Sequence, residues 1–146
     1  MVNTKACHLT IELQKPKPIY YSGEPIVGVI KFKIAEKVKI TEVKCLINGE
    51  AHVHFTEKIF QNRAYSTRHF EEREQYIKTS ILLYRHEENE PYLDVGDHSY
   101  PFKFTLPTSE LATSFNHELG KIYYSIIASL KINWYILKFI EKILYF

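Results

Sequence analysis

Two histidines separated by one residue, His52 and His54, have the type and spacing most suggestive of chemistry in this sequence. Side chains two positions apart on a β-strand lie on the same face, and imidazoles that share a face can bind zinc. A complete site needs a third ligand, which His69 or Glu50 would have to supply. The alternative is that both histidines simply fill the outer face of an alternating strand. We favour this second interpretation and predict no metal ligands.

Residues typical of catalysis or cofactor binding are absent from the sequence. No Ser lies in a Gly-x-Ser-x-Gly turn, no Cys-x-x-Cys or His-Glu-x-x-His occurs, and the five glycines are scattered singly. The acidic group Glu71, Glu72 and Glu74 is typical of a solvated edge or loop. We therefore predict a binding module with no catalytic residues, no cofactor-binding residues and no enzymatic activity.

Composition places the chain among ordinary folded domains. Its 146 residues are enough for one domain, and 45% hydrophobic with 25% charged residues allow a core to form. Nineteen Lys and Arg interleave with seventeen Asp and Glu, so no basic run suggests a nucleic-acid partner.

The two cysteines, Cys7 and Cys45, do not form a disulfide framework and are expected to be buried thiols. No signal peptide is visible, and no segment reaches the roughly 20 apolar residues that span a bilayer. Together these features predict a cytoplasmic protein.

Alternating apolar and polar residues predict strands along most of the chain. Asn48-Gly49 is either a hairpin turn or a bulge in one long strand. Residues 57–69 lack a clear period and predict a long loop, and Phe70–Tyr76 is an edge strand or a helical turn. About seven strands with few helical segments predict an all-β fold, an immunoglobulin-like antiparallel β-sandwich. The predicted strands lie near residues 9–13, 30–34, 43–47, 51–55, 81–84, 102–106 and 122–130.

The last thirteen residues interrupt this pattern. Lys138, Glu141 and Lys142 have the spacing of one helical face, and apolar residues cover most of the rest. A short C-terminal helix is therefore one prediction, and a continued strand or an end foreign to the fold are the alternatives. We expect a β-sandwich over residues 1–133 and an atypical apolar tail over 134–146.

A series of short motifs is more specific. It runs from Tyr20-Tyr21-Ser22-Gly23-Glu24 through Ile47-Asn48-Gly49-Glu50 to Gly96-Asp97-His98-Ser99-Tyr100-Pro101-Phe102-Lys103-Phe104, and then to Leu106-Pro107, Ser114-Phe115 and Gly120-Lys121-Ile122-Tyr123-Tyr124. In this order the motifs resemble the N-terminal domain of the α-arrestins, the arrestin domain-containing proteins, across most of the chain. The residues that carry the resemblance are Tyr21, Gly23, Gly49, Gly96, His98, Pro101, Phe102, Phe104, Pro107, Ser114, Phe115, Gly120 and Tyr124.

The sequence departs from that family in several places. Asn116-His117 stands where a Glu-Gly pair is common, and Phe55 stands where Trp is frequent. A second arrestin sandwich is missing. So is the Pro-Pro-x-Tyr motif that recruits WW-domain ubiquitin ligases, and we expect no direct binding of those ligases.

The resemblance implies a cytosolic adaptor. Its partners would be membrane receptors or transporters and endocytic sorting proteins, with a location at the plasma membrane or endosomes and a role in endocytic trafficking and ubiquitin-dependent sorting. The alternatives are a sorting-coat component similar to retromer subunits and a His-based metal-binding protein. Lys15 and Lys17 are either simply exposed or part of an anion-binding or partner-binding surface. The apolar tail also predicts self-association.

Overall fold

Ten β-strands make up the regular structure of the part of the chain that the computed structural model describes, namely residues 2–3, 6–108, 111–133 and 135–146. No helix occurs among these residues. The strands are β1 (Val2–Asn3), β2 (Cys7–Leu13), β3 (Ile19–Tyr20), β4 (Pro25–Ile34), β5 (Ile40–Gln61), β6 (Ala64–Arg85), β7 (Gly96–Thr105), β8 (Phe115–His117), β9 (Gly120–Ile132) and β10 (Tyr135–Tyr145).

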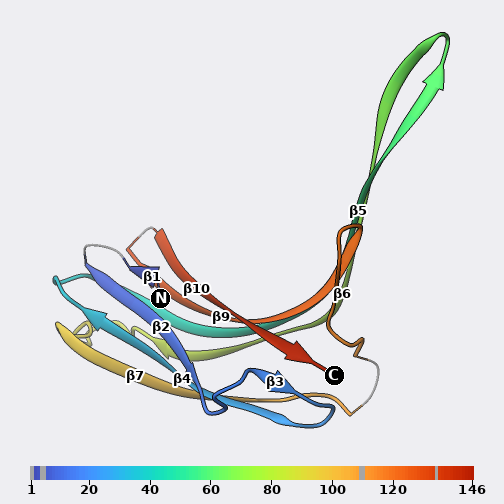
Figure 1. Ribbon diagram of the computed structural model, residues 1–146. Coiled ribbons are helices and arrows are strands. Elements are labelled where there is room, and N and C mark those ends of the chain that lie inside the picture. The colour runs from blue at the N-terminus through green and yellow to red at the C-terminus, as the bar shows by residue number, and fades with distance from the viewer. Residues whose placement is uncertain (1, 4–5, 109–110, 134) are drawn as a thin grey trace.

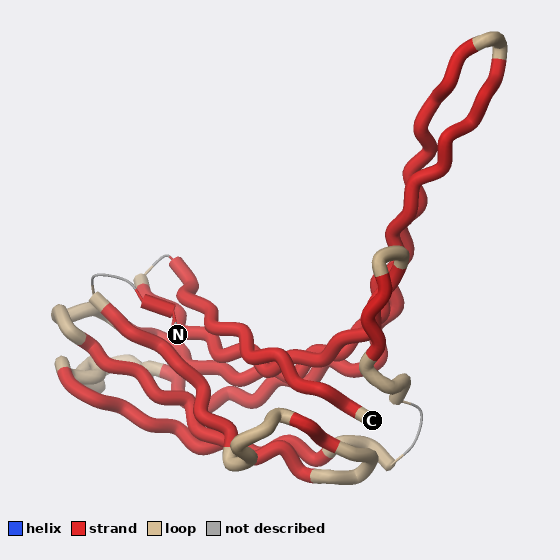
Figure 2. Tube along the Cα trace, viewed as in Figure 1, coloured by secondary structure: helices blue, strands red, loops and turns tan. Residues whose placement is uncertain are grey.

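The strands form two facing sheets, as Figures 1 and 2 show. One sheet has the order β1-β2-β4-β7, and the other has the order β3-β10-β9-β5-β6, with β8 paired to β9. The predicted all-β sandwich is thus confirmed. Every pairing is antiparallel except that of β3 with β10, which is parallel.

The core lies between the two sheets and follows from the alternation of each strand. Alternate residues of β2, β4, the first half of β5 and most of β9 are buried, and their apolar side chains join one hydrophobic cluster. Cys7 and Cys45 belong to this cluster as buried thiols, as the sequence predicts. The most completely buried large side chains are Tyr20, Tyr124, Leu9, Ile26, Ile30, Ile34, Ile40, Ile47, Leu106, Ile126, Leu130 and Ile132.

The predicted C-terminal helix is wrong, because residues 135–145 form strand β10. β10 pairs with β9 from Tyr135 to Ile143, and it buries Leu137, Ile143 and Tyr145 against the core. The helical spacing of the charged residues is also compatible with a strand, in which Lys138 and Lys142 both point outward. Trp134, where the predicted tail begins, lies outside the described residues.

The predicted loop over residues 57–69 is also wrong, because this segment belongs to the hairpin of β5 and β6. Each of these strands has 22 residues, and they pair continuously from Glu42 with Arg85 to Gln61 with Ala64. Of the two interpretations of Gly49, the bulge is correct, since the pairing with β6 shifts register between Gly49 and Glu50.

Pro101 lies inside β7, which begins at Gly96 and not near residue 102 as the sequence predicted. Among the described residues, β7 is the last strand of its sheet and pairs only with β4, with Pro101 opposite Val29. An edge strand tolerates proline because one side of its backbone needs no hydrogen-bonding partner.

Candidate functional site: a projecting ribbon

The distal part of the β5–β6 hairpin extends beyond the sandwich as a free two-stranded ribbon (Figures 1 and 2). The pairing of β5 with β9 ends at Val53 with Gly120, and the His54 amide donates one last bond to the Leu119 carbonyl at 2.9 Å. Beyond this point the two strands pair only with each other, from His54 with Glu71 to the turn at residues 62–63. We call residues 54–71 the ribbon.

A two-residue turn closes the ribbon. Asn62 and Arg63 both have positive φ, 52° and 61°, and they connect Gln61 to Ala64. Two successive residues with positive φ are typical of a type I′ turn, whose twist matches that of the flanking strands. The turn therefore favours a regular ribbon up to its end.

Aromatic side chains line both faces of the ribbon. On one face Phe60 and Tyr65 lie opposite each other with ring centroids 4.9 Å apart, and they are 61% and 78% exposed. On the other face, nearer the sandwich, Phe55 and Phe70 stack at 4.7 Å. These cross-strand aromatic pairs stabilise a two-stranded element that has no core of its own.

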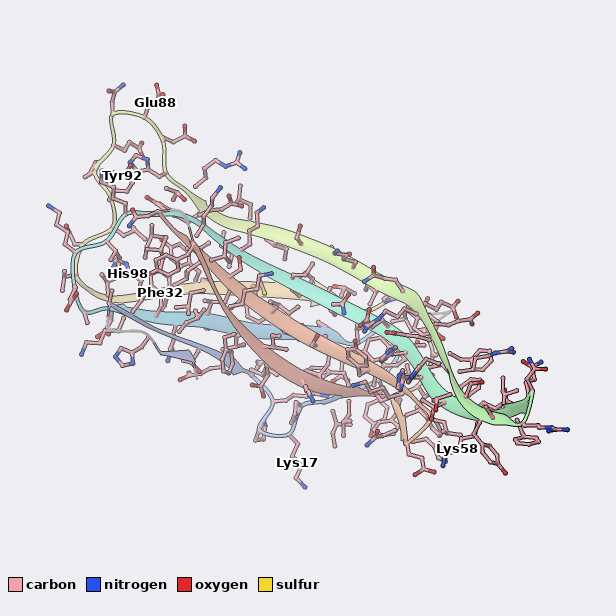
Figure 3. All side chains as sticks on the ribbon, turned by 90° about the horizontal axis from the view of Figure 1, so that it is seen from above. Lys17, Phe32, Lys58, Glu88, Tyr92 and His98 are labelled. Atoms are coloured by element: carbon pink, nitrogen blue, oxygen red, sulfur yellow. The ribbon has the colours of Figure 1, made fainter. Side chains whose placement is uncertain are left out.

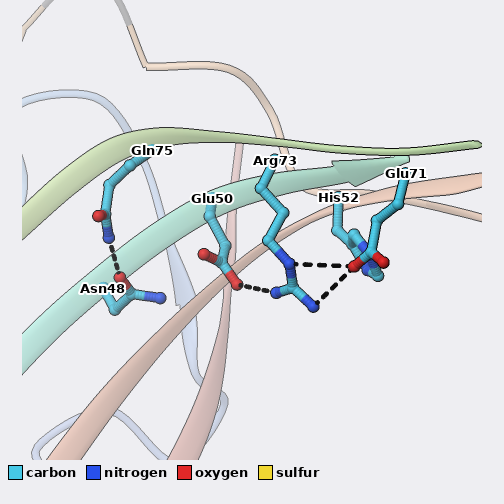
Figure 4. A network of polar contacts seen from close by, with 6 residues as sticks. All are labelled: Asn48, Glu50, His52, Glu71, Arg73 and Gln75. Carbon is cyan, nitrogen blue, oxygen red and sulfur yellow. Dashed lines mark hydrogen bonds and ion pairs between the residues drawn. The ribbon is translucent and has the colours of Figure 1, made fainter. Parts of the chain in front are cut away.

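A chain of polar contacts joins the two strands at the base of the ribbon (Figure 4). Arg73 donates one hydrogen bond at 3.3 Å to Glu50 and another at 3.3 Å to Glu71. Glu71 is also bound by Nε2 of His52 at 2.9 Å. Nearer the sandwich, the side-chain amide of Gln75 donates to that of Asn48.

These contacts lower the pKa of the Glu71 carboxyl below its ordinary value of 4.5. The hydrogen bond from His52 is the main cause, and the Arg73 guanidinium adds to it. Because Glu71 is exposed, solvent screens these ion pairs, and they contribute little to the stability of the fold.

The structure places His52, His54 and His69 on one face of the hairpin, as a zinc site would require. The ring centroids of His52 and His54 are 6.3 Å apart, and those of His54 and His69 are 6.5 Å apart. His52 is engaged by Glu71 and not turned toward the other rings as a ligand. Within the described residues, no group of three or more His, Cys, Asp or Glu side chains is arranged to hold a metal ion.

Several of the motif residues that carry the resemblance to α-arrestins lie together at the turn between β3 and β4. Gly23 has a φ of 75°, which favours glycine, and its amide donates to the Pro107 carbonyl at 3.2 Å. The neighbouring Ser22 hydroxyl bonds the carbonyl of Thr108 at 2.8 Å, and the Tyr21 amide bonds the Glu24 carboxylate at 2.9 Å. This group fastens the turn to the segment that follows β7.

Other motif residues connect β8, β9 and β10. Two hydrogen bonds join Ser114 and Tyr145. The Ser114 amide donates to the Tyr145 carbonyl at 2.8 Å, and the Tyr145 amide donates to the Ser114 hydroxyl at 2.9 Å. The buried Tyr124 donates its hydroxyl to the Ala112 carbonyl, and burial raises its pKa to about 12. Phe115 is 57% exposed on β8, and Gly120 begins β9 opposite Val53.

The remaining motif residues belong to β7. Phe102 and Phe104 are buried in the core, and Gly96 begins the strand with a φ of 132°. The His98 ring stacks on Phe32 at 5.2 Å, as the two labelled side chains in Figure 3 indicate.

Lys15 and Lys17 have different surroundings. Lys15 forms an ion pair with Glu24, donates to the Ile19 carbonyl at 3.0 Å, and lies over the Tyr20 ring at 4.9 Å. Lys17 is exposed and extends away from the sandwich (Figure 3). The structure therefore does not bring the two ammonium groups together around one anion.

The ribbon itself is the feature that sequence reasoning missed. A usable signal was present, because residues 50–90 contain neither Gly nor Pro. Such a stretch lacks the residues that most often interrupt strands. Asn62, which tolerates positive φ, stands close to the middle of the paired segment.

Two facing sheets with a projecting hairpin define the chain as a β-sandwich domain. The model of the arrestin (or S-antigen) N-terminal domain matches residues 9–144, and the chain belongs to this family. It is 28% identical over 120 residues to human arrestin domain-containing protein 1, covering 82% of this chain and 25% of that protein. It is 29% identical over 120 residues to human arrestin domain-containing protein 4, covering 79% and 28%.

The chain thus spans about a quarter of the length of the curated relatives it matches. Among solved structures, the sporulation control protein Spo0M of Bacillus subtilis is similar over 97% of this chain and 50% of that chain, with a TM-score of 0.48 and 15% identity. A search of the described residues for helices long and apolar enough to cross a bilayer finds none.

Proposed function

We propose that this chain is a non-enzymatic adaptor domain that binds membrane cargo proteins for endocytic trafficking and ubiquitin-dependent sorting. Membership of the arrestin N-terminal family supports this proposal, as does the similarity to arrestin domain-containing proteins. Its partners would be receptors or transporters together with endosomal sorting proteins, and it would work in the cytoplasm at the plasma membrane or at endosomes.

The observation that carries the proposal is the free outer edge of β6. In the described part of the chain, this 22-residue strand ends its sheet and pairs only with β5. An edge strand exposes a row of unpaired amide and carbonyl groups, to which an extended peptide can add as a further strand. A cytoplasmic segment of a membrane protein would bind in this way.

Site-specific photo-crosslinking in intact cells tests this mode of binding. A photoreactive residue at Thr79, exposed on β6, is compared with one at Lys33, exposed on the interior strand β4. We expect the Thr79 probe, and not the Lys33 probe, to capture membrane receptors or transporters and endosomal proteins. Capture of chaperones and proteasome subunits alone would contradict the proposal. One stoichiometric constitutive partner captured by both probes would instead indicate a sorting-coat component.

Recruitment of a ubiquitin ligase is expected to need more than these residues. The 146 residues contain no Pro-Pro-x-Tyr sequence, and Glu90-Pro91-Tyr92 does not replace it. We expect no heat of binding when isolated WW domains are titrated into the chain by calorimetry. Measurable WW-domain binding would overturn this part of the proposal.

A further inference from the structure

We propose that the end of the ribbon is a docking element for an anionic phospholipid surface. We call residues 58–70 the ribbon tip. The partner is the lipid headgroup layer itself, so the interaction requires no cargo protein and goes beyond the adaptor function.

The charge of the ribbon tip has one sign. The segment contains Lys58, Arg63 and Arg68 and no Asp or Glu, whereas the whole chain is nearly balanced at +2. Glu57 lies directly opposite Arg68 and offsets part of its charge, whereas Lys58 and Arg63 lie farther from the sandwich than both Glu57 and Glu71. The end of the hairpin therefore keeps an excess of positive charge, and such a cluster of Lys and Arg is attracted to anionic lipid.

Distance isolates this charge from the rest of the molecule. Eight residues of β5, from His54 to Gln61, continue past its pairing with β9, which corresponds to a length of about 25 Å. Electrostatic interactions are screened over about 8 Å at physiological salt. The acidic side chains of the sandwich therefore cannot neutralise the field at the tip.

The apolar side chains of the tip fit the layer beneath the headgroups. Phe60 and Tyr65 stack beside the turn and are among the most exposed large side chains of the described chain, at 61% and 78%. An amphipathic ring such as that of Tyr suits the boundary between headgroups and acyl chains. Arg68 lies 5.9 Å from the Phe70 ring, and its long side chain can reach up to the phosphates.

The backbone supplies an independent observation at Arg63. Arg63 is the second central residue of the type I′ turn and has a φ of 61°. Glycine is preferred at this position because it adopts positive φ without steric strain. A non-glycine residue there carries backbone strain, and strain of this kind is concentrated at functional positions. Arg63 thus occupies a position in the turn at the end of the ribbon that glycine would suit better.

Co-sedimentation of the full chain with protein-free vesicles tests the proposal. We expect binding to vesicles of phosphatidylcholine with phosphatidylserine, no binding to phosphatidylcholine alone, and release as salt is raised. R63G should weaken binding roughly fivefold, the effect of one lost charge. Because glycine suits this turn, R63G should be at least as resistant to thermal unfolding as the original chain.

Matched variants distinguish binding by the ribbon tip from an effect of net charge, or of exposed aromatic residues, anywhere on the surface. R63E with R68E should weaken binding more than tenfold, whereas K33E with K103E, the same charge change on exposed positions of the other sheet, should leave it within about twofold. F60S with Y65S should also lose binding. Y135S, which removes a 41% exposed aromatic from β10, should retain it.

Insertion is observed directly with a fluorophore on Q61C, since Cys7 and Cys45 are buried and react slowly. The expected result is a blue shift of its emission on anionic vesicles only. Three results would overturn the proposal. They are no binding to anionic vesicles at low salt, equal losses in tip and control variants, and binding only to vesicles that carry a membrane protein. The last would assign the tip to a protein partner.

Discussion

The ring of Tyr124 occupies the space that a side chain at position 49 would need. A Cβ added to Gly49 would overlap Cδ1 and Cε1 of Tyr124 and would lie 2.8 Å from Cγ2 of Ile77. The buried tyrosine on β9 therefore requires a glycine opposite it on β5, next to the bulge in the pairing of β5 with β6.

Substituting Gly49 by Ala should lower the free energy of unfolding by about 1–3 kcal/mol, because the packed ring must shift. Gly120→Ala is the matched control, since the nearest atom to its added Cβ, Cγ2 of Val53, is at 3.4 Å, an ordinary contact distance. Urea unfolding of both variants measures the difference. Equal stability of the two would show that Tyr124 does not restrict position 49.

The strand assignment of residues 135–145 predicts opposite effects for two isoleucines of β10. Ile143 is 3% exposed, and Ile143→Ala should lower the free energy of unfolding by about 2–4 kcal/mol. Ile140 is 56% exposed, and Ile140→Ala should lower it by less than about 1 kcal/mol. Thermal unfolding checks both. Two small and similar effects would indicate that this segment does not pack as a strand on the core.

Burial should make the thiols of the folded chain unreactive. Burial raises the pKa of Cys45 to about 12 and also raises that of Cys7, and the thiolate is the reactive form. At pH 8 we expect a thiol reagent to label both only as fast as the chain opens, whereas V53C, at a 41% exposed position, should react at once. Immediate labelling of the original chain would place a thiol at the surface.

The Glu71 carboxyl should titrate below its ordinary pKa of 4.5, mainly because His52 donates a hydrogen bond to it. A lowered pKa in the folded state means that ionised Glu71 favours folding. This contribution is complete above about pH 4.5 and is lost as the pH falls through the folded-state pKa. An NMR titration should show the pKa rising in His52→Ala. An unchanged pKa would leave Arg73 as the main cause.

Self-association remains a prediction, and β10 supplies a surface for it. Ile136, Ile140 and Leu144 lie on its outward face, with a lysine between each pair, and are 54%, 56% and 46% exposed. Light scattering should show a molecular mass that rises with concentration, and Ile140→Lys should suppress the rise. A monomer at every concentration would contradict the prediction.

Strands with one buried and one exposed face can be predicted from the sequence, whereas strands exposed on both faces cannot. Strands such as β2 and β4 have one buried face, and their alternation predicted them and the sandwich. In the ribbon both faces are exposed, so residues 57–69 carry no alternation and resembled a loop. In β10 the outward isoleucines hid the alternation, and the spacing of Lys138 and Lys142 suggested a helix instead.

The candidate site was harder to predict than the fold. The sequence directed attention to His52 and His54, which the structure places at the base of the ribbon in a polar network. The exposed aromatic pair at the tip follows no catalytic or ligand motif. Its position depends on where β9 ends beside β5, and this is a tertiary contact that no local pattern encodes.

The parallel pairing of β3 with β10 has a consequence for the order of folding. Ile19 and Tyr20 are hydrogen-bonded in their sheet through Leu144 and Tyr145, which lie at the other end of the chain. During synthesis, the buried Tyr20 must therefore wait for its strand partners until residues 144 and 145 have left the ribosome. Contacts between such distant residues slow folding, and they make the nascent β3 segment a place where chaperones would be needed.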